Sequence, residues 1–182
     1  RHVVWFSGAL VAVLAAGWII TIKFGDITKD NLLKSNLITA ETFAAAINPA
    51  HITELSGTTQ DAATPLFTTI KKQLEAAIKK NPYCRFLYLL ALKDDKVVFL
   101  ADAEPADSED YSPPGQIFDE APPEVLTAFH NGLQEFAGPY TDRWGTWFST
   151  FIPVKDREFQ KVLAVLGQDI DAKTWHSLIA RS

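Results

Sequence analysis

Three stretches of strand length have apolar residues on both of their alternating faces, and they limit the possible folds more than any other feature of the sequence. They are residues 85–92, 146–154 and 161–169. A strand that is apolar on both faces belongs in a sheet whose two sides are both covered. Two shorter apolar stretches, residues 97–101 and 136–140, complete a set of five predicted strands. We therefore expect one sheet with a covering layer on each side.

Helical segments before the first strand predict the layer on one side, and hence an α+β domain. Asn48 and Thr64 are each followed by a proline, a pair that is typical of an N-cap and the first helical position. The other side of the sheet is left to a loop at residues 102–116 and a helix at residues 124–131. Because a cover made largely of loop leaves room for a small molecule, this side is the expected ligand face.

The segment at residues 26–47 is predicted to be a long N-terminal helix. Its apolar residues recur at alternating steps of four and three positions, which places them on one face. They are Leu33, Leu37, Ala40, Ala44 and Ile47. This seam packs either on the sheet of its own domain or against the same helix of a second chain. A homodimer is the expected context, and it is compatible with both arrangements.

The first 24 residues are predicted to form a membrane-spanning helix. Residues 3–22 carry no charge and lie between Arg1 and Lys23. Twenty helical residues rise about 30 Å, which is the thickness of the hydrocarbon core of a bilayer. A secretory signal peptide is the alternative, because residues 15–17 are all small. The sequence contains no methionine, so we expect it to be a piece of a longer protein.

The composition argues against several classes of function. The formal net charge is −5, which makes nucleic acid a poor partner. The single cysteine, Cys84, rules out an intrachain disulfide framework. The histidines are far apart, and neither a catalytic constellation nor a glycine-rich phosphate loop is found. We therefore expect no catalytic residues, no metal ion and no cofactor in this chain.

A predicted hairpin at residues 138–153 places polar and aromatic side chains around a tight turn at residues 142–145. The glycine of this turn, Gly145, can adopt a positive φ that other residues resist. We expect the hairpin to form one wall of a binding pocket, together with polar side chains of the first two strands. The candidate ligand-binding residues are Tyr88, Asp102, Tyr140, Asp142, Arg143, Trp147 and Ser149.

Each candidate role has a structural alternative. Arg143 is suited to holding a carboxylate in a bidentate pair, and Asp102 or Asp142 to holding an amine. Aromatic residues offer flat apolar walls or a face for a cation. They are Tyr140, Trp144 and Trp147. The alternatives are core packing for the aromatic residues, an ion pair within the turn for Asp142 and Arg143, and a cap or turn role for Asp169.

Three motifs resemble those of a known sensor family. They are SEDYSPPGQ at residues 108–116, GPYTDRWGTW at residues 138–147 and GQDIDA at residues 167–172. With its order of predicted elements, the chain is similar over essentially its whole length to the PAS-like PDC/Cache sensor domains of bacterial membrane-bound histidine kinases and diguanylate cyclases. The resemblance implies a five-stranded antiparallel sheet in the order 2-1-5-4-3, with ligand on the face under the long loop.

The resemblance also implies a domain organisation and a function. Residues 1–24 would be a membrane helix, residues 25–170 the sensor domain, and residues 171–182 the start of a helix leading to a second membrane span. The sensor domain would lie in the periplasm, outside the cytoplasmic membrane, and bind a small carboxylate, amino acid or amine. It would pass a conformational change to a cytoplasmic output module. The alternative is a domain that binds no ligand and instead dimerises or contacts a partner protein.

Overall fold

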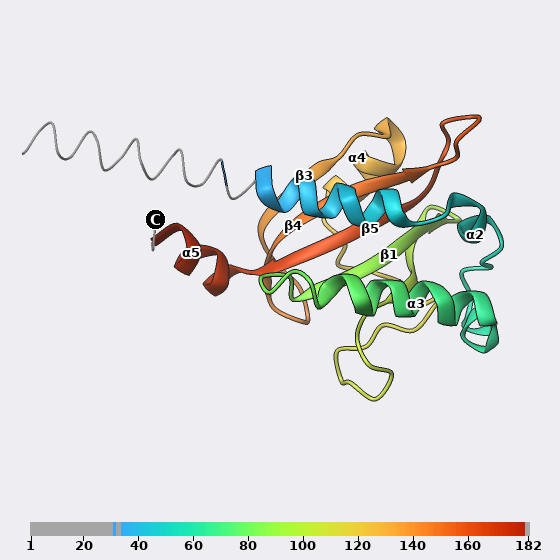
Figure 1. Ribbon diagram of the computed structural model, residues 1–182, viewed down its shortest axis with the longest axis horizontal. Coiled ribbons are helices and arrows are strands. Elements are labelled where there is room, and N and C mark those ends of the chain that lie inside the picture. The colour runs from blue at the N-terminus through green and yellow to red at the C-terminus, as the bar shows by residue number, and fades with distance from the viewer. Residues whose placement is uncertain (1–30, 32–33, 181–182) are drawn as a thin grey trace, which may run out of the picture.

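A five-stranded antiparallel sheet in the order β2-β1-β5-β4-β3 forms the centre of the structure, a computed structural model that describes residue 31 and residues 34–180 (Figure 1). The strands are β1 (Phe86–Lys93), β2 (Lys96–Asp102), β3 (Glu135–Thr141), β4 (Thr146–Lys155) and β5 (Val162–Asp171). All of them lie within two residues of their predicted positions. The α+β class and the implied strand order are confirmed.

The helices begin where the proline pairs predict. Residues 34–46 are helical, and further helices are α2 (Pro49–Thr53), η1 (Thr59–Ala63), α3 (Pro65–Ile78), α4 (Pro123–Asn131) and α5 (Ala172–Ala180). The Asn48 side chain accepts a hydrogen bond from the backbone N–H of Ala50, and Thr64 accepts one from Phe67. These N-caps replace the bonds that the first turn of a helix lacks. Helix α2 is short, and η1 is a single 3₁₀ turn between α2 and α3.

One face of the sheet is covered by the helix at residues 34–46 and by α3, which lie side by side in front of it in Figure 1. Ala40 is fully buried there, and Ala44 and Ile47 are almost so. The predicted seam therefore packs on the sheet of its own domain; Leu33 lies outside the described residues. A polar link joins the two layers, because Asn36 donates to the hydroxyl of Thr150 and accepts from the amide of Gln168.

The opposite face is covered by α4 and by the long loop that precedes it, as the sequence predicts. The loop is tied to the β2 edge by backbone bonds: Gly115 N–H donates to Phe99 and Phe118 N–H to Val97, both at 2.8–2.9 Å. The Phe118 side chain of this loop is buried beside Val125 of α4 in a second apolar cluster. Because hydrogen bonds to the sheet edge hold this loop, it can serve as a defined wall for a cavity.

The last strand leads directly into the last helix. The carboxylate of Asp171 accepts from the backbone N–H groups of Lys173 and Thr174, which confirms the predicted N-cap of α5. In Figure 1, α5 and the start of the helix at residues 34–46 lie at the same end of the molecule. The predicted membrane helix of residues 1–24 lies outside the described residues. Among those described, no helix combines the length and the apolar character needed to cross a bilayer.

Candidate functional site

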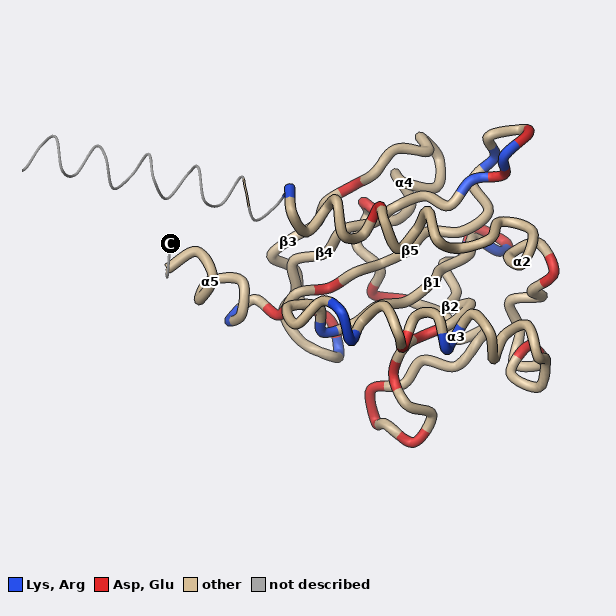
Figure 2. Tube along the Cα trace, viewed as in Figure 1, with Lys and Arg blue, Asp and Glu red and all other residues tan. Residues whose placement is uncertain are grey.

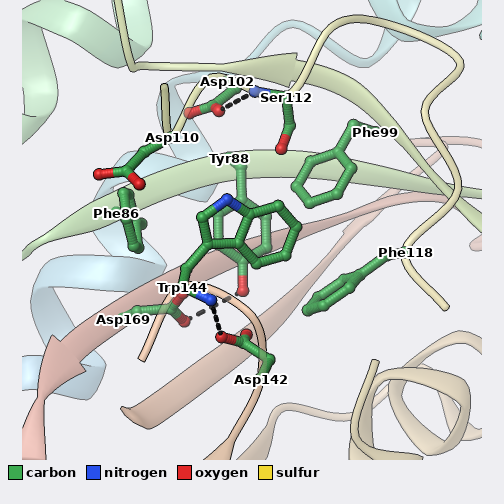
Figure 3. A pocket seen from close by; sticks show the side chains of 10 residues that line it. All are labelled: Phe86, Tyr88, Phe99, Asp102, Asp110, Ser112, Phe118, Asp142, Trp144 and Asp169. Atoms are coloured by element: carbon green, nitrogen blue, oxygen red, sulfur yellow. Dashed lines mark hydrogen bonds between the residues drawn. The ribbon is translucent and has the colours of Figure 1, made fainter. Parts of the chain in front are cut away.

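A pocket opens on the loop-covered face of the sheet, between the central strands and the β3–β4 turn (Figure 3). The space that it encloses, its open mouth included, is about 290 Å³, but only about 20 Å³ is open to the centre of a water-sized sphere, which is room for about one water molecule. Its lining combines aromatic rings with carboxylates. The lining residues are Phe86, Tyr88, Phe99, Asp102, Asp110, Ser112, Phe118, Asp142, Trp144 and Asp169.

Asp169 of β5 is the polar centre of the pocket. It is only 3% exposed, and its Oδ1 accepts hydrogen bonds from the hydroxyls of Tyr88, at 3.0 Å, and Ser149, at 2.6 Å. Ser149 has one hydroxyl proton, so Tyr140, whose hydroxyl lies 3.0 Å away, must donate to Ser149 in turn. Two hydroxyl donors, from β1 and β4, therefore hold the carboxylate, and a third hydroxyl, from β3, supports one of them. Within the described residues its Oδ2 has no hydrogen-bond partner.

The ring of Tyr88 reaches Asp169 because the facing strand has no side chain at the crossing point. Tyr88 of β1 pairs with Gly167 of β5 in the antiparallel register. A Cβ on Gly167 would lie 2.1 Å from Cε2 of Tyr88, a distance that no real contact permits. Glycine is therefore needed at this position because the Tyr88 ring comes so close, and not because the backbone adopts an unusual conformation.

The β3–β4 turn is ordered by Asp142 and places Trp144 over the pocket. Oδ1 of Asp142 accepts from the backbone N–H groups of Trp144 and Gly145 and from the indole N–H of Trp147, at 2.8–3.1 Å. Gly145 has φ 156°, as the sequence predicts, and a Cβ there would lie 2.6 Å from the Trp147 ring. Figure 3 shows the Trp144 indole lying across the centre of the pocket in front of Tyr88.

The opposite end of the pocket is built by Asp102 and the acidic loop that follows β2. The two carboxylate oxygens of Asp102 accept backbone N–H groups from Glu104, at 3.0 Å, and Ser112, at 2.8 Å. Asp110 of the same loop forms an ion pair with Arg85 at 2.6 Å. Figure 2 shows that acidic residues gather along this loop. The mouth of the pocket is therefore negatively charged.

Burial shifts the protonation of the pocket carboxyls. Burial, together with the nearby charges of Asp142 and Asp102, raises the pKa of Asp169 to about 7, although the bonds from Ser149 and Tyr88 oppose this. Burial likewise raises the pKa of Asp102 to about 6, against the two backbone N–H donors and Lys71. Both carboxyls therefore titrate close to neutral pH, and a cation placed beside them would favour their charged forms.

The structure brings most of the predicted site residues together, in two different ways. Those that line the pocket are Tyr88, Asp102 and Asp142. Those that support it from behind are Tyr140 and Ser149, which hold Asp169, and Trp147, which holds Asp142. Trp147 is 3% exposed and also packs edge-to-face on Phe86.

Arg143 lies outside this group. Its side chain and its backbone N–H both bond the carboxylate of Glu120, and its guanidinium lies over the ring of Trp144. The ion pair expected within the turn, between Asp142 and Arg143, is therefore not formed; Glu120 replaces Asp142 as the partner.

Sequence reasoning missed the residue at the centre of the site. Asp169 was assigned a cap or turn role because the apolar run before it was expected to end there, but β5 continues to Asp171. The available signal was the apolar Ile170, which follows Asp169 directly and is consistent with a strand that continues. Asp110, Ser112 and Phe118 were also missed, because the path of a long loop cannot be derived from its sequence.

No metal centre is evident in the part of the chain that the structure describes. Among those residues, no group of three or more His, Cys, Asp or Glu side chains is arranged to hold a metal ion. The carboxylates of the pocket are held by hydroxyl and backbone donors instead, which is the arrangement of a polar recognition site.

The fold of this chain is similar to that of several solved bacterial sensory domains. No protein-family model and no curated protein sequence matches the chain. The sensory domain of the Campylobacter jejuni chemoreceptor Tlp3 matches with a TM-score of 0.64 at 13% identity, over 89% of this chain and 62% of that one. The ligand-binding domain of Pseudomonas fluorescens CtaA, solved with L-alanine, has a TM-score of 0.52 at 16% identity, over 86% and 60%. That of Pseudomonas aeruginosa PctB, solved with L-Arg, has a TM-score of 0.51 at 18% identity, over 84% and 55%.

These neighbours share the architecture of the chain but are longer than it. The chain covers 61% of the Tlp3 domain solved with L-valine, with a TM-score of 0.62. All of them are ligand-binding sensory domains rather than catalytic ones. The five-stranded sheet with its order 2-1-5-4-3, covered by helices on one face and by loop and helix on the other, is therefore a fold that this chain shares with the ligand-binding domains of these chemoreceptors.

Proposed function

We propose that this chain is the non-catalytic ligand-sensing input domain of a membrane-bound signal-transduction protein. The observation that carries the proposal is the buried carboxylate of Asp169, which the hydroxyls of Tyr88 and Ser149 hold at the base of an aromatic pocket. A buried carboxyl costs folding free energy unless it is satisfied. Its second oxygen has no hydrogen-bond partner among the described residues and is not fully buried, so it is accessible to a group that a ligand brings.

The ligand is a small molecule of the carboxylate, amino acid or amine classes. The Trp144 indole lies across the pocket and leaves room for about one water molecule, so a ligand of that size would have to displace this side chain to enter. Structural neighbours were solved with L-valine, L-alanine and L-Arg bound, which supports small polar ligands as a class. The site residues in this proposal are the pocket-lining Tyr88, Asp102 and Asp142, with Tyr140, Trp147 and Ser149 behind them.

The domain would lie outside the cytoplasmic membrane, held by the uncharged residues 3–22. The helix at residues 34–46 and α5 lie at one end of the molecule (Figure 1), which is the geometry needed if both lead toward the same bilayer. The module that follows would be a cytoplasmic output domain, such as a histidine kinase or a diguanylate cyclase.

Strand β5 offers a route for the signal. Asp169 faces the pocket, and its neighbour Gln168 reaches the opposite face, where its amide bonds Asn36 of the N-terminal helix. The same strand continues into α5 after Asp171. A ligand that has different affinities for two conformations of β5 would therefore shift both the helix at residues 34–46 and α5.

A dimerisation or partner-protein module is the second candidate. It is favoured by an apolar groove of about 580 Å³ between the N-terminal helix and β3, whose lining includes Leu37 and Phe136. Ile38, on the same helix, is 61% exposed. In this alternative, Trp144 simply fills the pocket and the domain senses or holds a protein through the groove.

Thermal unfolding of the full chain in detergent micelles separates the two candidates. A ligand at a hundred times its dissociation constant adds about 2.7 kcal/mol, which raises the melting temperature by several degrees for a domain of this size. We expect at least one member of a panel of small carboxylates, amino acids and amines to do so, and Asp169→Asn to abolish the shift. Asp107→Asn, an exposed residue of the acidic loop, is the matched control. A shift that survives Asp169→Asn, or none at all, would refute ligand sensing at this pocket.

A further inference from the structure

The pocket contains four carboxylates and no basic side chain. Asp102, Asp110, Asp142 and Asp169 line it, whereas no Lys, Arg or His of the described residues does. Figure 3 shows them as two groups, Asp102 with Asp110 at one end and Asp142 with Asp169 at the other, with aromatic rings between. A bound molecule is thus surrounded by carboxyl groups, of which Asp110 is paired with Arg85.

Basic side chains next to this group already have partners, and one of those partners, Asp110, is itself a pocket carboxylate. Arg85 bonds two carboxylates at 2.6 Å each, and its charge is thereby balanced. Lys71 donates to two backbone carbonyl oxygens, of which that of Asp102 lies at 2.8 Å. Arg143 bonds Glu120 outside the pocket. A ligand carboxylate would therefore find no uncommitted cation among these side chains.

Asp169 supplies an independent reason to expect a ligand cation. It is 97% buried, and its 3% exposure lies within the pocket. Its Oδ1 holds two hydroxyl donors, but Oδ2 has no hydrogen-bond partner within residues 34–180. Because Oδ2 is not fully buried, an ammonium group, with three donors and a positive charge, could bond it and would favour the charged form of the carboxyl.

The aromatic lining suits the same kind of ligand. Tyr88, Phe99 and Phe118 form a cluster with ring centroids 5.3–6.3 Å apart, and Trp144 lies 5.8 Å from Phe118. Such rings offer apolar contact to a short alkyl chain and an attractive face to its ammonium end.

We infer that the ligand of this pocket is a small alkylamine that carries no carboxylate group. This inference rests on the proposed function and names the ligand class for the same site. A free amino acid would bring a carboxylate into a cavity that already holds four, and it would lose its hydration without gaining a cationic partner. The pocket is therefore expected to prefer an amine over the amino acid from which it differs by one carboxylate.

The raised pKa values of two pocket carboxyls predict how the affinity for an amine depends on pH. An ammonium ion binds best when Asp169, with its pKa of about 7, and Asp102, with its pKa of about 6, are charged. Affinity for an amine should therefore rise as pH increases from 5.5 to 8. The titratable groups around Asp169 are Cys84, Tyr88, Asp102, Asp110, Tyr140 and Asp142. The thiol and both phenols have raised pKa values, chiefly through burial, and stay neutral over this range.

Isothermal titration calorimetry of the full chain in detergent micelles tests the inference with matched pairs of probes. The pairs are isobutylamine with L-valine, and agmatine with L-arginine, which differ by the carboxylate alone. We expect an amine to bind at pH 8 at least about tenfold more tightly than its amino acid, and about tenfold more tightly than at pH 5.5. Asp169→Asn should lower that affinity at least about tenfold, and Asp107→Asn should leave it unchanged.

The possible results separate the inference from the function on which it rests. An amino acid that binds more tightly than its amine, with loss of binding in Asp169→Asn, would overturn the inference and leave the sensor function standing. Failure of both series to bind the folded chain would overturn both. If Asp169→Asn does not fold, the pH dependence of amine binding to the unaltered chain decides: a flat profile would overturn the inference.

Discussion

Replacing Asp169 with asparagine should remove most of the pH dependence of stability that the pocket imposes. The carboxyl has a pKa of about 7 in the folded chain against an ordinary value of 3.8. Between these values the folded state holds a proton that the unfolded state has released, so the free energy of unfolding falls as pH rises. At roughly 1.4 kcal/mol per pH unit, the loss from pH 4 to pH 7 is about 4 kcal/mol.

Asparagine keeps the shape of the side chain but cannot ionise. At pH 4.5 the variant should be no more stable than the unaltered chain, because the neutral aspartic acid already fits the site. At pH 8 the variant should gain about 3–4 kcal/mol relative to the unaltered chain, since only the latter carries the buried charge. Asp102 titrates in both proteins, so its contribution to the free energy of unfolding largely cancels in the difference between them.

Urea unfolding followed by tryptophan fluorescence at pH 4.5, 6 and 8 measures this difference. The exposed Asp107→Asn control should follow the unaltered chain at every pH. If the stability difference between Asp169→Asn and the unaltered chain stays constant from pH 4.5 to 8, Asp169 is not the perturbed carboxyl that the structure indicates, and the reasoning about its burial fails.

Two further predictions test the packing on the two faces of the sheet. Gly167→Ala should cost about 1–3 kcal/mol, because its methyl group collides with the ring of Tyr88; in a Tyr88→Ala background the same change should cost little, and additive costs in this double-mutant cycle would contradict the proposed close approach. Ala40→Leu, at a fully buried position of the N-terminal helix, should destabilise the chain by a similar amount in thermal unfolding, whereas Ala45→Leu on its exposed side should not. Equal effects at the two alanines would argue against packing of this helix on the sheet.

The elements were predictable from the sequence because their signals are local. Apolar runs of strand length and the Asn48 and Thr64 caps depend on neighbouring residues, and the structure confirms them. The coverage of both faces follows from the apolar character of the central strands, which cannot face water. The strand order, in contrast, came from the resemblance to PDC/Cache domains, because local signals do not determine how strands pair.

The site was predictable only in part, because its key contacts are between strands. Tyr88 and Ser149 were singled out as polar residues in apolar strands, but what they bond is decided by register: Ser149 of β4 pairs with Asp169 of β5. The end of an apolar run did not reveal that β5 continues beyond Asp169. The direction of Arg143 could not be foreseen either, since its partner Glu120 lies in a loop whose path depends on the whole fold.

The most direct test of the account is an NMR titration of Asp169 in the full chain with ¹³C-labelled aspartate carboxyls. The signal would be assigned by its loss in Asp169→Asn, and its pKa measured with and without saturating isobutylamine. We predict a pKa of about 7 in the free chain and a fall of at least about one unit when the ammonium group binds. A pKa near 4 in the free chain, or one near 7 that the bound amine leaves unchanged, would contradict the claim that Asp169 is the buried anchor of the ligand.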